Sequence, residues 1–237
     1  MASDPRAETV RELAQRLRKM QPVEARERVS SGIPALDQLL PTGGFHQGTL
    51  IEWLADGEGS GAGALALKQA REAMRIGGAL VVVDHQREFY PPAAWGLEID
   101  LERAIVVRPD NSADAIWALE QSLRSGGVAA SLCWIDRLHD RVFRRLQLAA
   151  ETGGGLGLLI RPSRAQTEPS WAEARLLVQP LPALSVSSGR RLQIKLLSCR
   201  GGTSGGAVEV EISHETGVVR VASQLADPTS LRRSAGA

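Results

Sequence analysis

The chain has 237 residues, enough to bury one substantial core and to form one domain or at most two. Its 28 lysine and arginine residues nearly balance 27 acidic residues, so a net charge of +1 does not by itself predict a nucleic-acid-binding protein. No run approaches the roughly 20 apolar residues that span a bilayer, and the N-terminus lacks the apolar core of a signal peptide. We therefore expect a soluble, cytoplasmic protein that does not contact a membrane.

The two cysteines, Cys133 and Cys199, lie far apart and form no CxxC or Cys/His pattern. The sequence therefore predicts neither a disulfide framework nor a zinc site, and we expect two apolar, buried thiols. The four histidines are scattered along the chain, so no metal site is predicted.

An amphipathic helix is predicted over residues 8–20. Val10, Leu13, Ala14 and Leu17 recur at helical spacing and fall on one face. A polar stretch follows and is expected to act as a linker, so residues 1–28 form a unit of their own. This helix can dock on its own domain or on a partner.

From residue 29 onward, strand and helix patterns alternate. Helical stretches over 65–75, 112–126 and 137–151 separate apolar, strand-like runs, which lie at 48–53, 79–84, 104–109, 131–136 and 155–160. Nearly continuous apolar runs are typical of strands covered on both faces. We therefore predict an α/β fold with a mainly parallel twisted sheet flanked by helices.

After residue 161 the predicted strands follow one another without long helices between them. Residues 207–212 and 217–223 have the pattern of an antiparallel hairpin. We therefore expect antiparallel strands at the C-terminal edge of the sheet. The core domain is predicted to cover residues 29–225, and residues 226–237, which are small, polar and basic, are predicted to form a flexible tail.

A glycine-rich turn lies between the first long strand and its helix. A phosphate-binding loop presents backbone N–H groups at a helix N-terminus, with a lysine for the phosphates and a Ser/Thr hydroxyl for magnesium. Here Ala62 takes the place of the lysine and Gly63 that of the hydroxyl. We predict a degenerate phosphate loop made of Glu58, Gly59, Ser60, Gly61, Ala62 and Gly63.

The residues before this loop resemble the N-terminal core signature of RecA-type recombinases. The matching positions are Ser31, Gly32, Leu36, Asp37, Gly43, Gly44, Gly48 and Glu52. The resemblance puts a catalytic glutamate at Gln86 and the Walker B aspartate at Asp136. With no lysine, hydroxyl or glutamate, it implies a RecA-like P-loop core that is not an enzyme. No cofactor is expected, apart from ATP or ADP as a vestigial ligand.

The missing groups, together with a short region where recombinases have DNA-binding loops, make the chain similar to the ImuA family. The blocks GGFHQGTLIEWL, GSGAGALAL and RLQIKLLSCRGG carry this resemblance. It implies a non-catalytic adaptor in bacterial DNA-damage-induced mutagenesis, the SOS type of response with error-prone translesion synthesis. The implied partners are RecA and an ImuB-type Y-family-like protein, with an error-prone replicative-type polymerase engaged indirectly.

Two other functions fit the same residues. One is an unorthodox ATPase in which Lys68 supplies the charge that the loop lacks. The other is an inhibitor of cell division similar to SulA, which is a shortened relative of RecA. Under the adaptor hypothesis, the binding surfaces are the helix over 8–20 and the basic tail with Arg232 and Arg233.

Several charged residues allow two interpretations. Arg161, Arg164 and Arg175, with the single aromatic Trp171, fall where recombinases contact DNA, so they either touch single-stranded DNA or solvate a loop and meet a protein partner. The second interpretation is favoured, and the same choice applies to Arg200.

Asp84 and Asp136 each end an apolar run. We favour backbone-capping acids over magnesium ligands, because position 63 offers no hydroxyl.

Overall fold

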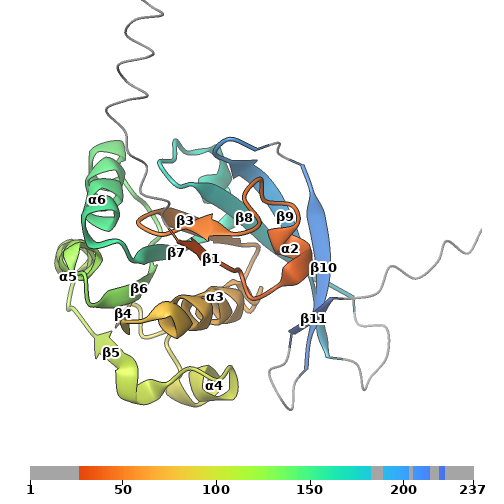
Figure 1. Cartoon of the computed structure of the whole chain (residues 1–237), viewed down its shortest axis with the longest axis horizontal. Helices are drawn as coiled ribbons and strands as arrows, with labels where there is room; N and C mark the ends of the chain where they lie inside the picture. The colour runs from red at the N-terminus through yellow and green to blue at the C-terminus, as the bar shows by residue number, and fades with distance from the viewer. Residues whose placement is uncertain (1–26, 183–188, 203–204, 214–218, 222–237) are drawn as a thin grey trace, which may run out of the picture.

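A nine-stranded mixed sheet organises the part of the chain that the computed structural model describes, residues 27–182, 189–202, 205–213 and 219–221 (Figure 1). The strand order is β11-β10-β9-β8-β3-β7-β6-β4-β5. A separate antiparallel ribbon pairs β1 (Arg28–Val29) with β2 (Phe45–His46). This architecture confirms the predicted RecA-like α/β class with a mainly parallel sheet.

The parallel half of the sheet forms where the predicted apolar runs lie. Its strands are β3 (Leu50–Ala55), β4 (Ala79–Val83), β5 (Ala104–Val107), β6 (Val128–Trp134) and β7 (Leu156–Pro162). All pairings among them are parallel. Their carboxyl ends therefore meet along one edge, which is where open α/β sheets place ligand sites.

Helices cover both faces of the parallel half, as a buried apolar sheet requires. One face carries α2 (Pro34–Asp37), α3 (Ala62–Ile76) and α4 (Pro91–Gly96); the other carries α5 (Ser112–Arg124) and α6 (Asp140–Gly153) (Figure 1). Two apolar cores result: one contains Trp53 and Leu65, the other Leu119 and Phe143. Short 3-10 turns, η1 (Leu101–Arg103) and η2 (Ser163–Thr167), precede β5 and follow β7.

The antiparallel part extends the sheet beyond β3. β8 (Ala174–Leu181) runs parallel to β3, and then β9 (Arg190–Cys199), β10 (Ala207–Ile212) and β11 (Val219–Val221) follow in antiparallel pairs. The predicted hairpin formed by the last two strands is confirmed. β8 itself pairs in parallel with the central strand β3, because the chain returns beside β3 after the turn η2.

Four of the five carboxyl ends of the strands β3 to β7 differ from the sequence prediction by two residues. β3 and β7 continue to Ala55 and Pro162, whereas β5 and β6 stop at Val107 and Trp134, so Asp136 lies two residues beyond its strand. The helix predicted over 8–20 and the tail over 226–237 lie outside the described residues. None of the helices within the described ranges is long and apolar enough to cross a membrane.

Candidate functional site

A pocket of about 710 Å³ opens at the carboxyl ends of β3, β6 and β7, beside the N-terminus of α3. The eight residues selected from the sequence all line it: Glu58, Gly59, Ser60, Gly61, Ala62, Gly63, Gln86 and Asp136. Its position is the one where α/β sheets hold ligands, and its size is within the usual range for small-molecule sites.

The loop that forms one wall of the pocket adopts a left-handed backbone at three glycines. Gly57, Gly59 and Gly61 have φ of 87°, 63° and 86°, a region that glycine enters at little cost. Ser60 is buried, and its hydroxyl accepts a hydrogen bond from the Ala62 N–H at 3.4 Å. One of the loop N–H groups that a phosphate would use is therefore already paired within the loop.

The strand β9 passes close over this loop. A Cβ on Gly61 would lie 2.5 Å from Leu192 Cδ1, and a Cβ on Gly59 would lie 2.9 Å from the Arg190 Nη2. Within the described ranges the Arg190 guanidinium makes no hydrogen bond or ion pair. The Arg190 side chain of β9 therefore places a positive charge against the loop, although residue 62 of the loop is an alanine and supplies none.

The side of the loop where magnesium would bind is apolar. A Cβ on Gly63 would meet the Trp134 ring at 3.6 Å and Ile160 Cδ1 at 3.8 Å. The Asp136 carboxylate is exposed and lies 3.6 Å from the Arg164 guanidinium. Magnesium requires several oxygen ligands in near-octahedral order. The residues present do not fit that ion here, because the indole of Trp134 and the sec-butyl group of Ile160 face position 63.

The two other predicted acidic and amide positions have different environments. The Asp84 side chain is buried and accepts hydrogen bonds from the backbone N–H groups of Glu88 (2.8 Å) and Phe89 (3.2 Å) and from Arg108 (3.3 Å). This is the backbone-capping role predicted for it. Gln86, two residues further on, is exposed and lines the pocket.

Lys68 lies away from the pocket, against the prediction that it could replace the loop lysine. Its side chain packs on Gly32, where a Cβ would meet Lys68 Cγ at 3.0 Å. Burial and the neighbouring Arg71 lower the pKa of this lysine. One and a half helical turns separate it from the start of α3, so the helix directs it to the β1 side. Lys68 is therefore not placed to supply charge at the loop, and the structure gives no support to the ATPase hypothesis in the form that uses this residue.

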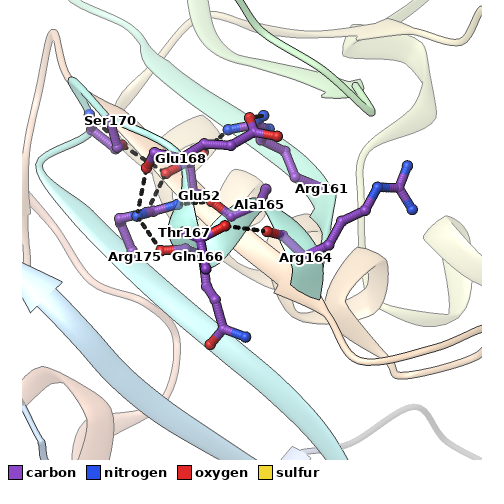
Figure 2. Close-up of polar contacts among 10 residues, drawn as sticks. Glu52, Arg161, Arg164, Ala165, Gln166, Thr167, Glu168, Ser170 and Arg175 are labelled. Carbon is purple, nitrogen blue, oxygen red and sulfur yellow. Dashed lines mark hydrogen bonds and ion pairs between the residues drawn. The ribbon is translucent and has the colours of Figure 1, made fainter.

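A buried ion network joins β3, β7 and β8, and one of its members, Arg161, also lines the pocket (Figure 2). Glu52 contacts Arg161 at 2.5 Å and Arg175 at 2.6 Å, and the Ser170 hydroxyl donates to it at 2.7 Å. Arg161 also contacts Glu168 at 2.5 Å. Arg175 donates to three backbone carbonyls in and beside η2, those of Ala165, Gln166 and Glu168.

This network corrects the interpretation of the arginines near the predicted DNA loops. Arg161 is 1% exposed and the Arg175 side chain is 11% exposed. Their contacts fix the turn η2, so neither arginine solvates a loop or faces a partner. Arg164 alone of the three is exposed, beside Asp136. Trp171 is also engaged: its indole donates to Asp140 at 2.7 Å and Arg144 lies 4.7 Å from the ring. Arg200 donates weakly to the Trp171 carbonyl.

Sequence reasoning missed the network, although one signal for it was available. In β3, Ile51 and Trp53 face the α3 side, so period-two alternation turns Glu52 to the opposite face. A carboxylate in the middle of an apolar strand needs a buried cation. The strand pairings place Glu52 level with Arg175 and two positions from Arg161, on the same face of the sheet.

Comparison with known proteins identifies the family. A model of the RecA N-terminal domain matches residues 9–142. Protein ImuA of Caulobacter vibrioides is 32% identical over 230 residues, which cover 88% of this chain and 94% of that protein. The chain belongs to the ImuA family of RecA-like proteins. The resemblance inferred from the loop and the signature before it is thus confirmed.

RecA proteins match a shorter part of this ImuA-family chain. Protein RecA of Chlorobaculum parvum is 36% identical over 100 residues, 42% of the chain and 28% of that protein. Among solved structures, the RadB recombinase superposes with a TM-score of 0.57 at 19% identity, covering 81% of this chain and 98% of that one. That similarity concerns the fold alone, and it agrees with the RecA-like core.

Proposed function

We propose that this ImuA-family protein is a non-catalytic, RecA-like adaptor in bacterial DNA-damage-induced mutagenesis. One observation carries the proposal: the phosphate loop and its pocket are kept, while three chemical groups are replaced. Ala62 replaces the phosphate-binding lysine, Gly63 faces Trp134 where a magnesium-binding hydroxyl would lie, and Gln86 takes the place of the glutamate.

Each replacement removes a different part of phosphoryl-transfer chemistry. Such catalysis depends on a cation at the phosphates, a magnesium ion that neutralises developing charge, and a group that positions the attacking water. A glutamine amide can orient water but cannot accept its proton. A fold that keeps its core without these groups is better suited to binding than to turnover.

The proposed partners are a RecA subunit and an ImuB-type Y-family-like protein, with an error-prone polymerase engaged indirectly. The amphipathic segment 8–20 and the basic tail offer sequence features for such contacts. Direct DNA binding is not proposed, because Trp171 and two of the three arginines at the former DNA-loop positions are engaged within the chain.

The adaptor proposal is tested by co-purification of RecA and the ImuB-type protein with the full chain and with a chain that starts at Val29. We expect the full chain to retain both partners and the truncated chain to bind at least one of them more weakly. Equal binding by the truncation would reject the assignment of residues 8–20. If neither chain binds either partner, the adaptor proposal is wrong.

A second candidate function is binding of a nucleotide without hydrolysis. The Arg190 guanidinium beside Gly59, which has no hydrogen bond or ion pair among the described residues, supports it, because it offers a positive charge to an anion held by the loop. Titration calorimetry with ATP and ADP, with magnesium and with EDTA, tests this candidate. We expect binding that does not need magnesium and that Arg190→Gln weakens, with Arg141→Gln, at an exposed arginine of α6 that does not line the pocket, as the control. Binding that requires magnesium, or that Arg190→Gln leaves unchanged, would contradict it.

A further inference from the structure

The strand β5 ends the parallel half of the sheet with an exposed apolar edge. No strand within the described residues pairs with its outer side. Ile105 is 55% exposed and Val106 38%, and the two side chains point to opposite faces of the sheet. The neighbouring elements add Leu101 from η1 and Trp95 from α4, which is 73% exposed (Figure 1). We call these four residues the β5-edge patch.

An uncovered patch of this kind is unusual for a soluble protein. Proteins protect sheet edges with charged side chains, bulges or a covering segment, because free backbone groups and apolar side chains invite association. β5 has none of these devices within its own four residues, AIVV. Trp95 stands mostly in solvent on α4, the helix that contacts η1 just before β5, and adds further exposed apolar surface. These features indicate that another segment covers the patch.

The surroundings of the β5-edge patch are acidic. Between residues 98 and 114 there are five exposed acids: Glu98, Asp100, Glu102, Asp110 and Asp114. Glu98 pairs with Arg71 of α3, and the other four form no ion pair among the described residues. The two bases in this stretch are engaged, since Arg103 donates to the carbonyls of Met74 and Gly78, and Arg108 pairs with Asp84. A covering segment should therefore be apolar on one side and basic beside it.

The segment over residues 8–20 of the same chain has this chemistry. Its apolar stripe is formed by Val10, Leu13, Ala14 and Leu17. The segment has four basic residues against two acids, Glu8 and Glu12, and three of the bases lie within residues 16–19. Lys19 is one of these bases. A helix of 13 residues is about 20 Å long, which is enough to cross the edge of β5 and reach α4.

The described chain begins at a place from which this segment can reach the patch. The Gln47 N–H donates to the Glu27 carbonyl, and Gln47 borders the same pocket as Gly78 and Gly155, at the amino ends of the parallel strands. The Gly78 carbonyl in turn accepts from Arg103, just before β5. Three strand spacings, about 14 Å, separate β7 from β5. The linker over 21–26 can span about 20 Å when extended.

We propose that residues 8–20 dock on the β5-edge patch of their own chain, with the apolar stripe on Trp95, Leu101 and Val106 and the bases toward the surrounding acids. This inference goes beyond the proposed function and does not depend on it. A helix held there would have to leave β5 before the same stripe could bind a partner.

Carbodiimide cross-linking of the purified full chain tests the proposal. The reagent joins a lysine amine directly to a carboxylate, and the lysines of the chain are Lys19, Lys68 and Lys195. We expect peptides that join Lys19 to acids within 98–114, recovered from the monomer band. Leu17→Asp should lower their yield by about tenfold, in line with loss of a local docked state. Gln15→Asp, the same charge on the opposite helix face, should leave the yield unchanged.

Amide exchange of Ala104–Val107 provides a second measurement, which does not depend on the reagent. Its protection should fall in Leu17→Asp, remain in Gln15→Asp, and stay constant from about 1 to about 100 µM protein, since intramolecular docking does not depend on concentration. Lys19 cross-links found only in a dimer band, or protection that rises with concentration, would assign the patch to a second copy and overturn the proposal. Unchanged cross-links and protection in Leu17→Asp would overturn it as well.

Discussion

Glu52 pairs with Arg161, which lines the pocket, and with Arg175, which holds the turn η2. It is fully buried in the central strand β3, and it balances Arg161 and Arg175, which come from the two neighbouring strands (Figure 2). A buried pair adds little net stability compared with apolar residues, but removal of one partner leaves an uncompensated charge in the interior. The network therefore fixes the position of η2 more than it stabilises the fold.

The substitution Glu52→Gln should destabilise the protein by about 3–5 kcal/mol, because two arginines lose their buried counter-charge. The matched substitution Asp136→Asn breaks an exposed contact with Arg164 and should cost less than about 1 kcal/mol. Urea unfolding followed by circular dichroism measures both values. If the two substitutions cost the same, the network does not act as a set of desolvated charges.

Cys133 should make stability depend on alkaline pH. Burial and the nearby Asp84 raise the pKa of this thiol from 9.0 to about 12. Below pH 9 the thiol is protonated in both states and its contribution to stability is complete. Above pH 9 the unfolded chain releases the proton and the native chain keeps it, so stability should fall by about 1.4 kcal/mol per pH unit.

The comparison with Cys133→Ala isolates this effect from other groups that titrate at high pH. We expect the difference in unfolding free energy between wild type and Cys133→Ala to be constant up to about pH 8.5 and to shrink above pH 9. Cys199 is only half-buried, and its raised pKa is common to both proteins. A difference that stays constant to pH 11 would mean that the Cys133 thiol is solvated in the native state.

At the scale of elements, the sequence predicted most of what the structure contains. The order of strands and helices from residue 29 to 212 follows apolar runs and helical spacing, which are local signals. The network around Glu52 and the contact of Trp134 with position 63 were missed, because each joins residues about 70 to 120 positions apart through strand register. The stop of β6 before Asp136 was also missed, since the apolar run continues through Ile135.

The loop between β3 and α3 allows two effects on one element to be separated. Gly57 and Gly61 have nearly the same positive φ, 87° and 86°. A Cβ on Gly57 meets nothing within 4 Å, whereas a Cβ on Gly61 would overlap Leu192 of β9. Any difference between alanine substitutions at these positions therefore measures how firmly β9 holds the loop.

Gly57→Ala should cost about 1 kcal/mol, the usual strain of an L-residue in the left-handed region. Gly61→Ala should cost about 1–3 kcal/mol more, since overpacking moves Leu192 or the loop. Thermal and urea unfolding give both values. The double variant Gly61→Ala with Leu192→Ala should recover part of the packing term, although the cavity reduces the gain. Equal costs for the two single substitutions would show that β9 gives way without strain.

At the scale of the whole molecule, the pocket is lined by residues from separate parts of the chain. The loop follows β3, Gln86 follows β4, Trp134 ends β6 and Arg161 belongs to β7. The sheet brings these residues together whether or not they catalyse a reaction. A RecA-like core can thus keep its stability and its pocket while the residues for hydrolysis are lost independently.

Ala62→Lys alone should therefore not restore ATP hydrolysis. The new ammonium group would supply charge at the phosphates, but position 63 would still lack a hydroxyl, Trp134 would still face the magnesium position, and Gln86 could not accept a proton. Phosphate release by purified Ala62→Lys, with ATP and magnesium, should equal the wild-type background. A variant that also carries Gly63→Thr, Trp134→Asp and Gln86→Glu is the matched test. Together with Ala62→Lys, these substitutions supply the hydroxyl, a carboxylate at the magnesium position and a carboxylate that can accept a proton. Turnover by Ala62→Lys alone would mean that loss of one charge, and not the combined loss across α3, β4 and β6, separates this chain from an ATPase.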